Sequence, residues 1–188
     1  MIKIGITGSL ASGKTTATKL IRKGKYPLFD ADQCVKNLYK DKNFIKKIIK
    51  KFKIKKEKNI KMQIRKIIIK ERKNLRRLEL FIHPIIRNKM KKFSLENKKK
   101  KIILFEIPLL VESKLMKFFN IIIFVKSSKE IRLKRYLKKG GNKSLFTTLD
   151  GHQLKSDKKV KYCDHIIVNN KSLLILKNKI QNIMSKYE

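Results

Sequence analysis

The chain has 188 residues, of which 41% are hydrophobic and 35% charged, and its 51 Lys and Arg against 14 Asp and Glu give a formal net charge of +37. This length suits one compact domain with room for a small insertion. The two cysteines, Cys34 and Cys163, are too few for a disulfide framework. The apolar runs are strand-sized, and the first is followed too soon by glycine to be a signal peptide. We therefore expect a cytoplasmic protein without a membrane span.

The positive charge has more than one explanation. Lysine and arginine neutralise phosphates in non-specific nucleic-acid binding, and a positive field also concentrates anionic small substrates. The basic residues are 43 lysines and 8 arginines spread along the whole chain, as drift toward A/T-rich codons would produce. We favour drift over a selected nucleic-acid surface. We also expect a monomer, because such a surface disfavours self-association.

Short apolar runs alternate with helical patterns along the chain. The strand-length runs lie at 3–7, 27–29, 102–107, 121–125 and 165–168. Helical patterns are expected at 14–23, over much of 35–93, after Ser127-Ser128, and at 173–184. His83-Pro84 predicts a helix boundary or kink within the long block. The alternation predicts an α/β fold with a parallel sheet flanked by helices, and the long block predicts a helical insertion.

The segment after the first predicted strand has the pattern of a phosphate-binding loop. Residues 8–15 read GSLASGKT, which fits G-x-x-x-x-G-K-[ST] in full and opens a predicted helix. Backbone N–H groups of such a loop point at phosphate oxygens, and the helix N-terminus adds partial positive charge. We expect Lys14 to reach the terminal phosphates and the Thr15 hydroxyl to bind Mg²⁺. The predicted ATP-binding residues are Gly8, Ser9, Leu10, Ala11, Ser12, Gly13, Lys14, Thr15 and Thr16.

Acidic residues follow two of the predicted strands. Asp30 and Asp32 come directly after the second, which would place them at the C-terminal edge of a parallel sheet, and the strand period of two would point both to one side. One carboxylate could accept the proton of an acceptor hydroxyl while the other holds Mg²⁺. An Asx-type turn is the alternative. Glu106 ends a later strand and either lies near Mg²⁺ or pairs with a lysine.

At this point the chain resembles the dephospho-CoA kinase family of P-loop kinases. The resemblance extends over nearly the whole chain, and the H-P and P-L-L-x-E segments are its most specific parts. The matching segments are 7–16 (TGSLASGKTT), 30–32 (DAD), 78–86 (LELFIHPII), 107–112 (IPLLVE), the basic residues Arg132 and Arg135, Gln153, and 164–169 (DHIIVN).

The resemblance implies that ATP phosphorylates the ribose 3′-hydroxyl of dephospho-CoA, giving CoA and ADP in the final step of coenzyme A biosynthesis. It implies a P-loop core at about 1–34, 100–131 and 158–188, a helical insertion for the CoA substrate at about 35–99, and a lid at about 132–157. Its cofactors are ATP and Mg²⁺, and its partners are ATP and dephospho-CoA.

The resemblance also implies roles for individual residues. Asp32 becomes the base that faces the acceptor hydroxyl, and Asp30 joins Thr15 at the metal. Arg135 acts catalytically from the lid, and Asn169 contributes to the nucleotide site. His83 and Leu109 lie near the CoA substrate, although His83 could equally cap and pack a helix end.

Several positions depart from the family's pattern. Ser9 and Ala11 replace glycines of G-G-I-G-S-G-K, and we expect Ala11 to have a negative φ because Cβ penalises positive values. Lys139 stands where the lid usually carries arginine, and lysine lacks arginine's planar fork. Leu149 occupies another arginine position. These changes predict a weaker clamp on ATP, or a share of that role for Arg135.

Two other classes of protein share part of the pattern. Another P-loop nucleoside or nucleotide kinase would have the same loop, with the H-P and P-L-L-x-E segments accidental. A nucleic-acid-binding NTPase would show a recognition module or interleaved aromatics. Here the aromatics are 8% of residues and mostly Phe within apolar runs, which favours a core.

Overall fold

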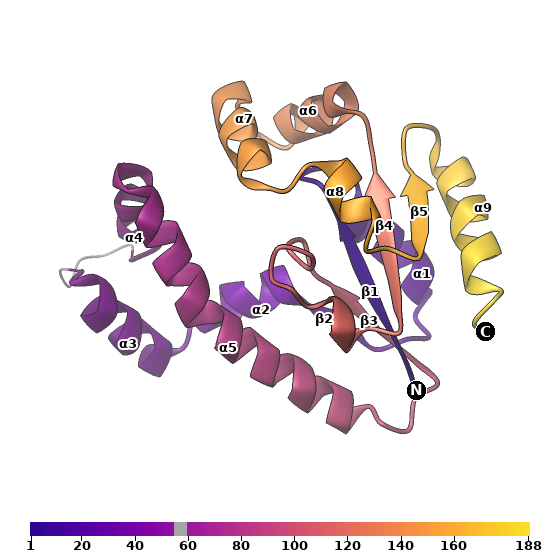
Figure 1. The fold of residues 1–188 in the computed structure, drawn as a ribbon, viewed down its shortest axis with the longest axis horizontal. Helices are drawn as coiled ribbons and strands as arrows, with labels where there is room; N and C mark the ends of the chain where they lie inside the picture. The colour runs from indigo at the N-terminus through magenta and orange to yellow at the C-terminus, as the bar shows by residue number, and fades with distance from the viewer. Residues whose placement is uncertain (55–59) are drawn as a thin grey trace. The chain divides into compact units, whose positions relative to one another are not determined.

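The computed structural model describes residues 1–54 and 60–188, which divide into two units (Figure 1). One unit comprises Met1–Asp30 with Asn97–Glu188, and the other is Ala31–Glu96. Residues 55–59 of the predicted insertion lie outside the described residues. Helices in the described part of the chain lack the length and apolar character that a membrane crossing requires.

A parallel sheet forms the centre of the first unit, and within the described residues it has five strands. Their order in space is β2-β3-β1-β4-β5, and all four pairings are parallel. The predicted α/β fold with a parallel sheet is confirmed. The strands are β1 (Ile2–Gly8), β2 (Leu28–Asp30), β3 (Ile102–Glu106), β4 (Ile121–Lys126) and β5 (His165–Val168).

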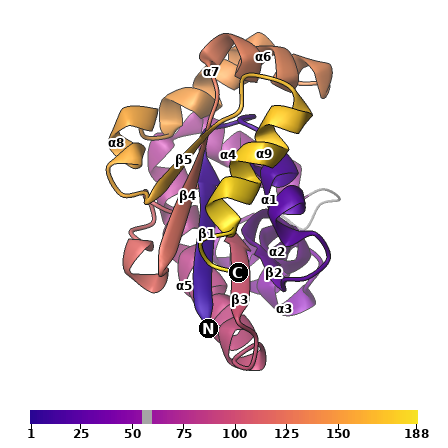
Figure 2. The same cartoon turned by 90° about the vertical axis from the view of Figure 1, so that its right-hand side faces the viewer.

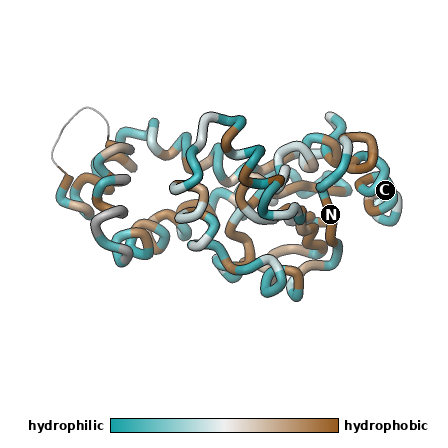
Figure 3. Tube along the Cα trace, turned by 90° about the horizontal axis from the view of Figure 1, so that it is seen from above, coloured by the Kyte–Doolittle hydropathy of each residue, from teal (hydrophilic) through white to brown (hydrophobic). Residues whose placement is uncertain are grey.

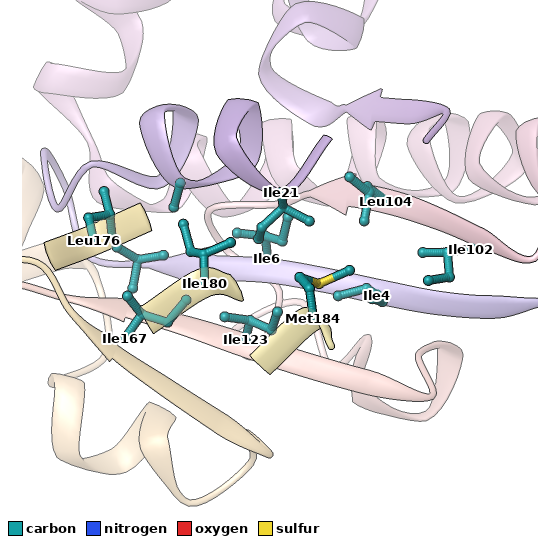
Figure 4. Close-up of a cluster of buried hydrophobic side chains, with 12 residues drawn as sticks. Ile4, Ile6, Ile21, Ile102, Leu104, Ile123, Ile167, Leu176, Ile180 and Met184 are labelled. Carbon is teal, nitrogen blue, oxygen red and sulfur yellow. The ribbon is translucent and has the colours of Figure 1, made fainter. Parts of the chain in front are cut away.

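Apolar side chains cover both faces of this sheet, which explains why its central strands read as continuous hydrophobic runs. Helices α1 (Lys14–Arg22) and α9 (Leu173–Met184) lie side by side on one face (Figure 2). Figure 4 shows their Ile21 and Ile180 beside Ile6 of β1, and Met184 beside Ile4 of the same strand. This packing fixes β1 against α1, and therefore both ends of the loop that joins them.

The remaining helices of the first unit follow β3 and β4. They are the 3₁₀ turn η1 (Met116–Phe118), α6 (Lys129–Lys138), α7 (Lys143–His152) and α8 (Ser156–Val160). Ser128 caps α6 by accepting a hydrogen bond from the N–H of Ile131, as one of the two serines was predicted to do. On the second face of the sheet, Phe105 meets Phe118 and Phe119 edge to face at centroid distances of 5.5 and 5.3 Å.

The second unit is helical in its described residues. It contains α2 (Ala31–Leu38), α3 (Lys42–Phe52), α4 (Ile60–Lys70) and α5 (Arg72–Glu96). Hydrophilic and hydrophobic residues alternate along these helices (Figure 3), as expected where each buries one side. Within the unit, Phe44 of α3 stacks on Phe81 of α5 at 5.7 Å.

Of the helix boundary or kink predicted at His83-Pro84, the boundary is wrong, because α5 continues through Pro84. A proline inside a helix costs about 3 kcal/mol. Burial of apolar side chains on both sides of Pro84 offsets that cost and continues at helical spacing, at Leu78, Ile82, Ile86 and Met90.

Candidate active site

The loop between β1 and α1 has the architecture of a phosphate site. Gly8 ends the strand and Lys14 begins the helix, as the sequence predicts. The Lys14 ammonium donates to the carbonyl oxygens of Gly8 and Ser9 at 3.1 and 3.0 Å. Within the described part of the chain, the buried Ser12 hydroxyl has no hydrogen-bond partner. An unsatisfied hydroxyl beside a lysine and a helix N-terminus suits an anionic ligand.

Ala11 adopts a φ of +57°, so the expectation of a negative value is wrong. The left-handed region costs an L-residue about 1–2 kcal/mol. Neighbours on both sides account for it, because the backbone of Leu10 and that of Ser12 are each hydrogen-bonded to side chains from distant parts of the chain. The loop geometry is therefore imposed on Ala11 by what holds its flanks.

Oxygen donors gather where α1 meets the ends of two strands. The Thr15 hydroxyl donates to Glu106 Oε1 at 2.7 Å, and Glu106 is the buried last residue of β3. Asp30 is the last residue of β2 and pairs in register with Glu106. Mg²⁺ prefers hydroxyl, carboxylate and phosphate oxygens and usually takes only one or two carboxylates from a protein. Thr15, Glu106 and Asp30 therefore fit Mg²⁺.

The two aspartates do not share a strand. Asp30 ends β2, but α2 begins at once with Ala31, so Asp32 lies in the first turn of a helix. The strand periodicity used to pair them therefore does not apply, and the two residues fall in different units. A carboxylate in the first turn is stabilised by the helix dipole.

Two further residues predicted to lie near the CoA substrate are on different elements. His83 lies within α5 of the second unit, where burial lowers its pKa, with Glu79 opposing and Arg87 reinforcing that shift. Leu109 is half-buried in the turn after β3 in the first unit. The structure therefore does not join these two residues in a single unit.

The start of the loop is held by residues of the predicted lid segment. Arg132 of α6 donates to Asp150 of α7 at 2.5 and 3.1 Å, and also to the Leu10 carbonyl oxygen at 3.3 Å. The Leu10 N–H in turn donates to Gln153 Oε1 at 3.0 Å. Asp150 was missed by the sequence reasoning. It is the one acidic residue of α7, and a lone carboxylate in the otherwise uncharged stretch 144–151 was the available signal.

A buried ion pair ties the P-L-L-x-E segment to the same region. Lys159 of α8 is fully buried and lies 2.5 Å from Glu112 Oε1, which also accepts the N–H of Leu154 at 3.2 Å. Next to this pair, Ser156 Oγ lies 3.0 Å from Ser9 Oγ. The segment that follows Gln153 is therefore connected both to the turn after β3 and to the phosphate loop.

The end of the loop is held by a second set of side chains. Asn169 Nδ2 and Arg135 Nη1 both donate to the Ser12 carbonyl oxygen, at 2.9 and 3.2 Å. Arg135 also donates to Ser127 Oγ at 2.9 Å and to the Asn169 carbonyl oxygen at 3.0 Å. Ser127 donates to that same carbonyl at 2.5 Å. The sequence suggested Ser127 only as a helix cap, which in fact is Ser128.

A phosphate loop whose threonine meets a strand-end acid, on a five-stranded parallel sheet, defines a P-loop kinase-like nucleotide site. A family model described as Dephospho-CoA kinase matches residues 2–174. A protein of Rickettsia typhi named Dephospho-CoA kinase is 32% identical over 189 residues, covering 100% of this chain and 98% of the relative. The chain belongs to the dephospho-CoA kinase family.

Solved structures share the fold. The dephospho-CoA kinase of Campylobacter jejuni superposes with a TM-score of 0.70 at 25% identity, covering 98% of this chain and 96% of that one. TT1252 from Thermus thermophilus superposes with a TM-score of 0.85 at 23% identity, covering 100% and 98% of the two chains.

Proposed function

We infer that this protein transfers the γ-phosphoryl group of ATP to the ribose 3′-hydroxyl of dephospho-CoA, giving CoA and ADP, the final step of coenzyme A biosynthesis. Membership of the family supports the substrate. The structural observation that supports phosphoryl transfer is the Thr15–Glu106 hydrogen bond at the mouth of the phosphate loop, because it joins the expected metal ligand to a carboxylate at the strand edge.

The nucleotide half of the reaction is attributed to the first unit. Backbone N–H groups of residues 8–16 bind the phosphates, and Lys14 moves from the loop carbonyls to the terminal phosphates. We propose that Thr15 and Asp30, with Glu106 beside them, hold Mg²⁺, which when bound neutralises charge on the phosphate oxygens. Asn169 contributes by contacting the loop itself.

The acceptor half is attributed to Asp32, with His83 and Leu109 as substrate contacts. A ribose hydroxyl is a poor nucleophile, so it needs both alignment and a proton acceptor. Asp32 supplies a carboxylate two residues after Asp30, in the first turn of α2. We propose that the hydroxyl proton passes to an oxygen of this carboxylate as the new O–P bond forms.

Asp32→Asn tests that role, because asparagine keeps the size of the side chain but cannot take the proton. We expect a loss of transfer to dephospho-CoA on the order of 10² or more, with ATP binding retained in calorimetry. Asp30→Asn should instead raise the Mg²⁺ concentration needed for half-maximal rate. An active D32N with an inactive D30N would reverse the two roles, and full activity in both would remove them from the mechanism.

The wider organisation is also part of the proposal. We propose that residues at about 35–99 hold the CoA substrate and that those at about 132–157 act as a lid, in a cytoplasmic monomer. Binding to nucleic acid is proposed to be incidental to the net charge of +37. Sedimentation of the active protein tests the monomer. Two measurements test whether nucleic-acid binding is incidental. We expect the protein to elute from heparin as the salt concentration rises, and we expect added DNA to leave the kinase rate unchanged.

A further inference from the structure

We propose that Arg135, Asn169 and Ser127 form a positioning set that fixes the peptide between Ser12 and Gly13, so that the Gly13 N–H faces the ATP phosphates. This inference rests on the proposed use of ATP at the loop. It gives Arg135 a role behind the loop, in place of a lid contact to phosphate.

The direction of the peptide follows from its two acceptor contacts. Asn169 Nδ2 and Arg135 Nη1 both donate to the Ser12 carbonyl oxygen, at 2.9 and 3.2 Å. In a trans peptide the N–H points away from the C=O of the preceding residue. Holding the Ser12 carbonyl toward Asn169 therefore holds the Gly13 N–H toward the opposite side, at the N-terminus of α1 where phosphate binds.

The set is built from parts of the chain that are themselves fixed. Ser127 follows β4 and Asn169 follows β5, and these two strands are neighbours in the sheet. Both residues are buried, at 7% and 6% exposure. The guanidinium of Arg135 bridges them by donating to Ser127 Oγ and to the Asn169 carbonyl oxygen. The peptide between Ser12 and Gly13 is thus held in a fixed position relative to the sheet.

A second observation is the space at Gly13, which has a φ of +94°. A Cβ atom at this position would lie 2.2 Å from Asn169 Nδ2. Gly13 is therefore needed for two reasons. It adopts a positive φ, and its lack of a side chain lets the Asn169 amide reach the loop.

The hydrogen bonds made by Arg135 distinguish positioning of the Ser12–Gly13 peptide from a simple supply of positive charge. The side chain donates to three oxygens, those of Ser12, Ser127 and Asn169, which a planar guanidinium can do and an ammonium on a flexible stem cannot do in the same geometry. A phosphate clamp would also use the planar fork, because arginine binds phosphate through two parallel N–H groups. Arg135→Lys therefore separates both of these roles from charge alone, whereas Ser127→Ala keeps the guanidinium and removes a hydrogen-bond partner that only the positioning role uses.

The experiment measures ATP kinetics together with competitive inhibition by inorganic tripolyphosphate, which has the phosphates of ATP but no adenosine. Competition against ATP ensures that binding elsewhere on the basic surface is not counted. The variants are Arg135→Lys, Asn169→Asp and Ser127→Ala. The matched controls are Asn170→Asp and Asn170→Ala, since Asn170 Oδ1 accepts the backbone N–H of Ser128 at the start of α6 and not a group of the loop.

We expect Arg135→Lys and Asn169→Asp each to raise the KM for ATP and the inhibition constant of tripolyphosphate together, by roughly tenfold. Ser127→Ala should give a smaller rise, and the controls none. The KM for dephospho-CoA should not change in any variant. A thermal melt shows which variants fold, and Arg135→Lys with Ser127→Ala suffice if Asn169→Asp does not.

Two results would overturn the positioning role. Wild-type values for Arg135→Lys would mean that charge alone matters at this position. A raised KM for ATP with an unchanged tripolyphosphate constant would place the contact at adenosine. If the unmodified protein failed to phosphorylate dephospho-CoA, the proposed function would be wrong. The role of the positioning set would still be decided separately, by measuring how well tripolyphosphate competes with ATP for binding in each variant.

Discussion

The two ends of the phosphate loop are held by different kinds of structure. At its start, Leu10 is bound by Arg132 and Gln153, which belong to the predicted lid segment. At its end, Ser12 is bound by Asn169, which directly follows a strand of the sheet, and by Arg135. The first set lies on α6 or directly after α7, whereas the second combines Arg135 of α6 with Asn169 and Ser127, which follow the strands β5 and β4.

This difference indicates a division of labour within one short loop. The end of the loop carries the helix N-terminus and needs a fixed orientation before ATP arrives, because preorganised donors cost no reorganisation during reaction. If residues at about 132–157 act as the lid we propose, their movement would release the start of the loop, while Asn169, which lies outside that segment, would still hold the Ser12 carbonyl oxygen. Loop closure and phosphate binding can therefore be perturbed separately.

The largest expected effect is at Lys14, whose side chain reaches the start of the loop while its backbone opens α1. Lys14→Ala should lower kcat by a factor on the order of 10² or more, because it removes positive charge from where the transition state concentrates negative charge. Steady-state kinetics on a variant shown to be folded by circular dichroism would test this. Near-normal turnover in that variant would end the assignment of the loop to phosphate binding.

Much of this division could not be predicted from the sequence. The strands, α1, α9 and the phosphate loop follow from local patterns: an apolar run, a glycine motif, a helical periodicity. The partners of Leu10 and Ser12 lie more than 120 residues away along the chain, at Arg132, Arg135, Gln153 and Asn169. Only the crossover of parallel strands brings such residues together, and no spacing rule in one sequence encodes that.

Two expectations about where an element begins or ends were wrong. Pro84 was expected to interrupt a helix, yet packing on both sides carries α5 through it. Asp32 was paired with Asp30 by strand periodicity, although α2 begins between them at Ala31. In both cases the residue types were interpreted correctly, but the position of the element boundary was wrong, since it depends on packing that the pattern does not show.

The second effect concerns the start of the loop. Asp150→Asn removes the carboxylate that pairs with the buried Arg132 guanidinium, and breaking such a pair costs on the order of 3 kcal/mol. We expect hydrogen exchange of the Leu10 amide to accelerate at least about tenfold, while the Ala17 amide, which donates to the Gly13 carbonyl oxygen, keeps its protection.

Asp157→Asn is the control for that measurement, because Asp157 is 88% exposed and pairs only loosely with Lys126 at 3.4 Å. Amide exchange followed by NMR in the full chain gives both rates from one sample. Equal acceleration at Leu10 and Ala17 in the D150N protein would show that the loop opens as a single piece, and the distinction between its two ends would be lost.

The smallest effect is at Ala11, which lies between the two sets with a φ of +57°. If the flanking contacts impose that conformation, glycine should relieve about 1–2 kcal/mol of strain. It would also raise the entropy of the unfolded chain at a cost of about 0.4–1 kcal/mol, so Ala11→Gly should stabilise the protein by about 0.5–1 kcal/mol.

Lys114→Gly is the matched control, since its φ of +54° is similar and it lies outside the loop. Urea unfolding without nucleotide should show both gains, and Asp150→Asn should reduce the gain at position 11 alone by loosening its flank. A destabilised A11G beside a stabilised K114G would mean that alanine at this position makes packing contacts that outweigh the backbone strain.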